Sequence, residues 1–219
     1  MNMTLISALE EAWMVDVQDA FNNDKINSEH SLQALLYAGL SRSLAVLPGN
    51  HLIFVEPKFD KKKYSDPNFP NEFAKIINYC PDLLIVNRVT MTIECIIELK
   101  CKPHLPNYLL FKDVEKDLIK LSDFSSQKLT GKSLEFDVFG PDRPFNVKKN
   151  KWLTGRPEYM FHSNTIACFG SIALDDGNMV SHFLAKQHYK INNFVLLTGP
   201  APNIFHNSPY SPMQFEVSY

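Results

Sequence analysis

The chain has 219 residues, 45% of them apolar, so it is long enough to bury a hydrophobic core as one domain with an elaboration. Its 22 Lys and Arg residues are balanced by 24 Asp and Glu residues, which excludes a strong overall positive field and leaves nucleic-acid contacts to local patches. The four cysteines form no CxxC pair and no apolar run is long enough to cross a bilayer, so we predict a soluble, cytoplasmic protein without membrane contact.

The first half of the chain predicts two helices and three strands. Residues 4–21 have helical periodicity, within an N-terminal helical extension at 1–26. A second helix begins at Glu29, after a cap at Asn27 or Ser28, and its leucines recur at helical spacing: Leu32, Leu35, Leu36, Leu40, Leu44 and Leu47. Strands are predicted at 51–56, 82–87 and 92–99, and the last two form an antiparallel hairpin that turns near Val89 or Thr90.

The second half begins with an amphipathic helix at 109–124. Its apolar stripe holds Val114, Leu118 and Leu121, and a second stripe holds Lys112, Lys116 and Lys120. Residues 129–157 are rich in Gly, Pro, Lys and Asn and are predicted to be an insertion. Two later strands, "NTIACFGSIAL" and "NNFVLLTG", flank a helix at "MVSHFLAKQHY". These elements predict a single α/β (α+β) domain over residues 1–219.

Charged residues mark both ends of the hairpin "CPDLLIVNRVTMTIECIIELK". Alternation along the second strand places Glu98 and Lys100 on one face, and Ile93, Cys95, Ile97 and Leu99 on the other. Antiparallel pairing brings Asp82 opposite position 96 or 98, close to Glu98. Two adjacent carboxylates repel unless a cation lies between them, and Mg²⁺ prefers such oxygen ligands. A neighbouring lysine suits phosphodiester hydrolysis, because it can stabilise the developing negative charge.

Pro81-Asp82 followed by Glu98-Leu99-Lys100 resembles the motif of the PD-(D/E)xK nuclease superfamily, and the resemblance covers about residues 27 to 125. It implies a restriction-endonuclease-like core of order αβββαβ, with a central mixed sheet flanked by helices. It also implies that Asp82 and Glu98 bind Mg²⁺, for which Mn²⁺ can substitute. Lys100 would assist the attacking water, and Glu29 would complete or orient the ligand set. The implied substrate is nucleic acid, DNA ahead of RNA, in restriction, repair, recombination or defence against mobile DNA.

Each candidate residue also has a structural interpretation. Glu29 can interact with the helix dipole, and Glu56 is either an auxiliary ligand or a surface acid. The basic runs either follow a phosphate backbone or are solvated loops; their residues are Lys61, Lys62, Lys63, Lys148, Lys149, Lys151 and Trp152. The lysine stripe has the same two interpretations, and Asp113 and Asp117 beside it favour the solvated one.

Two rival interpretations of the whole chain remain. It is either a nuclease-like domain without activity that serves binding or assembly, or an unrelated α/β protein with an accidental motif. A homodimer or a partner protein stays open.

Overall fold

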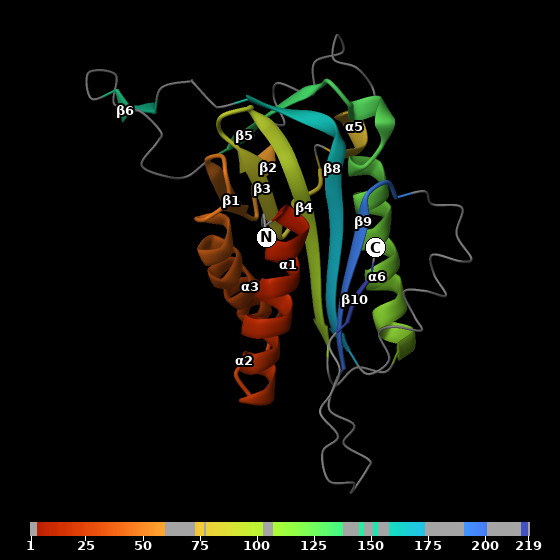
Figure 1. Cartoon of the computed structure of the whole chain (residues 1–219). Helices are drawn as coiled ribbons and strands as arrows, with labels where there is room; N and C mark the ends of the chain where they lie inside the picture. Colours follow the sequence, from red (N-terminus) through yellow and green to blue (C-terminus); the bar gives the residue numbers. More distant parts are fainter. Residues whose placement is uncertain are drawn as a thin grey trace, which may run out of the picture.

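The computed structural model describes residues 4–59, 73–76, 78–102, 107–137, 145–146, 151–152, 158–173, 191–200 and 216–218. Helices come first, followed by a mixed sheet with a further long helix (Figure 1), which confirms the predicted α/β class. The helices are α1 (Leu5–Glu11), α2 (Gln18–Asn22), α3 (Glu29–Leu44), α5 (Phe73–Ile76) and α6 (Asn107–Phe124). A π-helical segment (Ala12–Val17) joins α1 to α2, and a 3-10 turn (Gln127–Leu129) follows α6.

Among the described residues, the main sheet contains eight strands, in the order β1-β3-β4-β8-β5-β2, with β9 also paired to β8 and β10 to β9. Their bounds are β1 (His51–Val55), β2 (Lys58–Phe59), β3 (Leu83–Asn87), β4 (Thr92–Lys102), β5 (Ser133–Asp137), β8 (Glu158–Ala173), β9 (Phe194–Pro200) and β10 (Glu216–Ser218). A separate two-stranded sheet pairs β6 (Phe145–Asn146) with β7 (Lys151–Trp152). β4 and β9 run parallel to β8, and the other pairs are antiparallel.

Each face of the sheet packs against helices (Figure 1). Leu32, Leu36 and Leu40 of α3 pack with Trp13 on the face that holds Ile97 and Leu99 of β4. The opposite face packs against Val114, Leu118 and Leu121 of α6. Because β4 and β8 are parallel, the chain must cross over between them, and α6 lies in that crossover. The predicted apolar stripes of both long helices are therefore the buried ones.

The hairpin β3–β4 forms as predicted, with a turn at Arg88–Met91, but the predicted alternation is wrong at one residue. A β-bulge interrupts the pairing, so Ile93 packs on the α6 face, whereas Cys95 packs on the α3 face. An extra residue reverses the alternation on one side of it. Beyond the bulge the prediction holds, and Ile96 faces α6.

Of two further predicted segments, one contains a strand and the other lies outside the described residues. The first part of the predicted insertion at 129–157 contains β5, which extends the main sheet by pairing with β8. The predicted helix at 179–189 lies outside the described residues. Within the described part of the chain, no helix is long and apolar enough to cross a membrane.

Candidate active site

Strand β4 continues past the start of β3, and the candidate residues lie where β4 no longer pairs with β3. Leu83, the first residue of β3, pairs with Ile97, so the register places Asp82 opposite Glu98. Residues 98–102 of β4 pair with β8 on one side but with no residue of β3 on the other. This gap leaves room for side chains from the first turn of α3 and from α6.

Asp82 is fixed by hydrogen bonds at both its main chain and its side chain. Its Oδ2 accepts from the Leu99 backbone N–H at 2.6 Å, in the place where the next strand residue would pair. Its carbonyl oxygen accepts from Gln33 Nε2 at 2.9 Å and from the Glu56 backbone N–H at 3.0 Å. Gln33 lies one turn after Glu29 on α3, so α3 helps to position the start of β3.

A chain of ion pairs links the remaining candidates. Lys100 Nζ lies 3.4 Å from Glu29 Oε2 and 2.8 Å from Asp117 Oδ2, and the latter contact is an ion pair without hydrogen-bond geometry. Lys120 Nζ lies 2.7 Å from Asp117 Oδ1 and 3.1 Å from Glu98 Oε2. The structure thus brings Glu29, Glu98 and Lys100 together with two residues of α6 that the motif does not contain.

The cluster is buried and its charges are unbalanced. The side chains of Glu98 and Asp117 are 2% and 3% exposed, and those of Lys100 and Lys120 are 13% and 15% exposed. With Asp82 and Glu29, the cluster has four carboxylates and two ammonium groups, and its net charge is −2 when all are ionised. Glu98 Oε1 is buried without a hydrogen-bond partner within the described residues. An unpaired, buried carboxylate oxygen is costly, so this charge distribution favours an additional cation.

Burial is the main cause of the shifted acid pKa values. It raises the pKa of Asp82 to about 6, against the lowering effect of the Leu99 hydrogen bond, and Glu29 adds to the rise. Burial and the neighbouring Asp117 carboxylate raise the pKa of Glu98 well above its ordinary value. For Lys100, burial alone would lower the pKa, but Asp117 and Glu29 outweigh it and hold the pKa above its ordinary value. Lys100 is therefore an ammonium ion at neutral pH.

The donor set fits a hard divalent cation held mainly by water. Among the described residues, no group of three His, Cys, Asp or Glu side chains is placed to hold a metal ion. Mg²⁺ needs no such cage, because it keeps several waters and binds proteins through one or two carboxylates. Asp82 and Glu98 are the two carboxylates that would hold it, and Glu98 Oε1, which has no hydrogen-bond partner in the described part of the chain, is an available ligand atom.

The other predicted residues have no described side-chain contact with this cluster. Glu56 contacts Asp82 only through its backbone N–H, and its side chain is exposed, as are those of Lys112 and Lys116 on α6. Lys61, Lys62, Lys63, Lys148 and Lys149 lie outside the described residues. Lys151 and Trp152 form β7, but their side chains are not described. Their predicted contact with nucleic acid remains a prediction.

Sequence reasoning missed Asp117, Lys120 and Gln33. Asp117 had been assigned to a solvated face, yet it lies three residues after Val114 and four before Leu121 on the buried stripe. Glu29 likewise lies three and seven residues before Leu32 and Leu36 of the buried stripe of α3, so an acid at the register of a buried stripe was a signal available for both residues. Lys120 differs from Lys112 and Lys116 because its side chain reaches Glu98.

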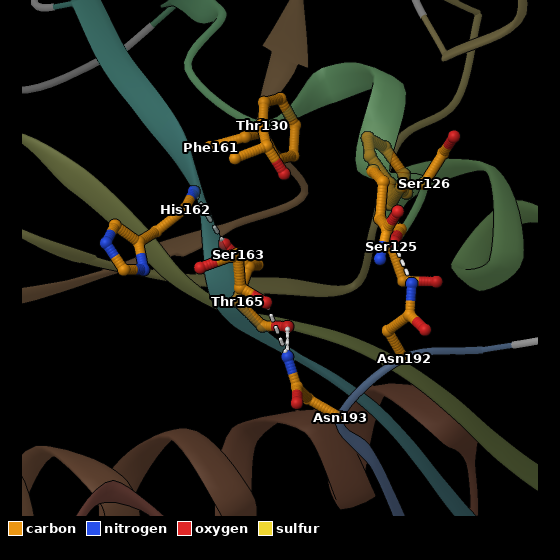
Figure 2. Close-up of a pocket in the computed structure, with 11 residues that line it drawn as sticks. Ser125, Ser126, Thr130, Phe161, His162, Ser163, Thr165, Asn192 and Asn193 are labelled. Atoms are coloured by element: carbon orange, nitrogen blue, oxygen red, sulfur yellow. Dashed lines mark hydrogen bonds between the residues drawn. The ribbon is translucent and has the colours of Figure 1, made fainter.

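A separate pocket of about 180 Å³ lies near the other end of β4. Figure 2 shows its Ser, Thr and Asn side chains, with Asn193 directed at Ser163 and Thr165. Thr165 Oγ1 donates to the Ile93 carbonyl, five residues before Glu98 on β4, or about 17 Å at the usual rise per residue. Its polar groups are largely engaged in holding backbone segments together, so we do not include it in the candidate site.

The chain matches no protein-family model, no curated protein and no solved structure.

Proposed function

We propose that this protein is a metal-dependent nuclease that hydrolyses phosphodiester bonds of nucleic acid, with DNA expected ahead of RNA. Among the described residues, the single observation that supports it most is the buried Glu98 oxygen without a partner, beside a second carboxylate and a protonated lysine. That combination favours a bound cation and can stabilise a phosphoryl transition state. A biological role in restriction, repair, recombination or defence is implied only by the resemblance to the PD-(D/E)xK motif.

The arrangement of elements supports the proposed relationship to the restriction-endonuclease-like fold. The chain order α3, β1, β3, β4, α6, β8 follows the order of that core. Pro81-Asp82 comes directly before β3, and Glu98-Leu99-Lys100 lies near the end of β4, the strand that pairs with it. Within that order β2, α5, β5, β6 and β7 are additional, and β9 and β10 follow it.

In the proposed mechanism each residue has a separate role. Asp82 and Glu98 would hold Mg²⁺, which when bound would supply Lewis-acid polarisation and make the attacking water more acidic. Lys100 stays protonated, so it donates hydrogen bonds to the phosphate oxygens and the attacking water, and stabilises the negative charge of the transition state. Glu29 orients Lys100 through their ion pair.

The alternative proposal is a nuclease-like module without activity. One observation favours it: Lys120 already lies against Glu98, and Lys100 against Asp117 and Glu29, so ion pairs partly neutralise the carboxylates without any metal. In that case the ion pairs would hold the end of β4 between α3 and α6. The module would then bind partners or nucleic acid through other surfaces.

A cleavage assay separates these proposals. Labelled single- and double-stranded DNA and RNA would be incubated with the purified protein in Mg²⁺, in Mn²⁺ and in EDTA. A nuclease cleaves at least one of the four substrates with either metal and none in EDTA. Absence of cleavage under every condition, by protein that is folded and cooperative on melting, supports the inactive module.

A further inference from the structure

Asp117 is the central member of the ion-pair cluster, although it lies outside the motif that suggested the site. Its two carboxylate oxygens contact different lysines, with Oδ2 2.8 Å from Lys100 Nζ and Oδ1 2.7 Å from Lys120 Nζ. One lysine comes from β4 and the other from α6. The carboxylate of Asp117 therefore brings one ammonium group of the sheet and one of helix α6 close together.

The environment of Asp117 restricts both lysines. The Asp117 side chain is 3% exposed, and its neighbours Val114, Leu118 and Leu121 pack in the core between α6 and the sheet. A residue held so firmly has little conformational freedom, so its oxygens are fixed points for the two flexible lysine side chains. Lys112 and Lys116, on the same helix, are exposed.

We propose that Asp117 is a positioning residue of the candidate site, which holds Lys100 and Lys120 as a pair of ammonium groups for the phosphate of the transition state. This inference rests on the proposed nuclease function. Lys120 then has a role of its own, because an incoming phosphate can replace Glu98 as one partner of its ammonium group while Asp117 continues to hold it. The pair gives the phosphate two cations beside the metal, which a single motif lysine does not provide.

The first test measures lysine order without reference to activity. Lysine ammonium groups that are held by carboxylates give observable ¹H–¹⁵N signals, and Lys100→Arg and Lys120→Arg assign the two by their disappearance. Both signals should be present in the wild type and in Asp113→Asn, an exposed acid one turn earlier on α6. In Asp117→Asn both should broaden or vanish. Two sharp signals that remain unchanged in Asp117→Asn would overturn the proposal.

The second test separates positioning from a purely structural role. On the substrate that the wild type cleaves, Asp117→Asn should lower kcat by about 10- to 100-fold, the usual loss for a group that orients a catalytic residue. KM should change by less than about threefold, because the effect falls on the transition state. In a Lys120→Ala background, Asp117→Asn should cost less than it does in the wild type, because one of the two lysines that Asp117 holds is already absent. An additive loss, or an unchanged kcat, contradicts the proposal.

Two further outcomes, a variant that does not fold and a wild type that cleaves nothing, also have a defined meaning. If Asp117→Asn does not fold, Asp117→Glu replaces it, since it keeps the charge but displaces it by one methylene, and the same loss of signals and of kcat is expected. If the wild type cleaves nothing, the nuclease function is wrong. The ammonium spectra then still decide whether Asp117 orders the two lysines.

Discussion

The residue with the clearest pH signature is Asp82. Burial raises its pKa to about 6 in the folded protein, whereas the unfolded chain has an ordinary aspartate pKa of about 3.9. Between these values the folded state binds more protons than the unfolded state, so this group lowers stability as the pH rises from about 4 to about 7. This loss of folding stability is fully present at neutral pH and absent below about pH 4.

Asp82→Asn should therefore stabilise the metal-free protein at neutral pH. Asparagine keeps the shape and can still accept the Leu99 N–H, but it cannot ionise. We expect the free energy of unfolding to rise by about 1–3 kcal/mol at pH 7 and to stay nearly unchanged at pH 4. Urea unfolding in EDTA across this range measures the difference. A variant that is less stable at every pH would show that the carboxylate is held by a stabilising partner.

At the same scale, the sequence predicted the motif residues but not their neighbours. Asp82 and Glu98 follow from strand pairing, because the hydrophobic pattern and the turn of a hairpin, which set its register, are close together in the sequence. The contact between Lys120 and Glu98 depends on how far α6 is rotated about its axis and where it crosses β4. Those quantities are set by packing against the whole sheet, which periodicity does not specify.

At the scale of elements, β8 passes close to β4 and the N-terminal helices at one glycine. A Cβ at Gly170 would lie 2.7 Å from Leu99 Cδ2 and 3.3 Å from Trp13 Cζ3. Leu99 and Trp13 are both fully buried, so neither has free space into which to move. The side chain of Leu99 points away from the site, but its backbone N–H holds Asp82.

Gly170→Ala should destabilise the protein by about 1–3 kcal/mol, the usual cost of overpacking a core. Thermal and urea unfolding measure this cost. Leu99→Val removes the Cδ2 atom, so Gly170→Ala should cost less in the Leu99→Val background than in the wild type. An equal cost in both backgrounds would place the clash elsewhere.

The elements themselves were predicted unevenly. The helix from Glu29 and the strands β1, β3 and β4 have strong local patterns, and they were found close to their actual bounds. β5 was missed because "SLEFD" is short and lies in a segment rich in Gly, Pro and Lys; it forms a strand by pairing with residues 158–160 of β8. The bulge between Ile93 and Cys95 was missed for a similar reason, since pairing with β3 determines it.

At the scale of the whole molecule, the N-terminal helices are part of the core. Trp13 is fully buried, packs with Leu36 of α3 and residues of the sheet, and donates from Nε1 to the Thr198 carbonyl of β9 at 3.1 Å. Leu9 and Val17 are buried in the same cluster. The predicted extension thus covers one face of the sheet (Figure 1).

Deletion of residues 1–26 should therefore abolish cooperative folding. It removes large apolar side chains from one of the two cores and exposes the sheet residues beneath them, which is a loss greater than the usual total stability of a domain. Thermal unfolding followed by circular dichroism should show no sigmoidal transition. A truncated chain that melts within about 5 °C of the full chain would contradict this account.

The central claim is that Asp82, Glu98 and Lys100 form a metal-dependent hydrolytic site, and Lys100→Ala tests it most directly. The measurement is the cleavage rate at saturating Mg²⁺, with Mn²⁺ titration of the same protein and with Lys116→Ala as the matched control on an exposed lysine. The account predicts that Lys100→Ala loses cleavage but retains the metal, because its ammonium group acts in the transition state. Cleavage by Lys100→Ala at the wild-type rate would contradict it.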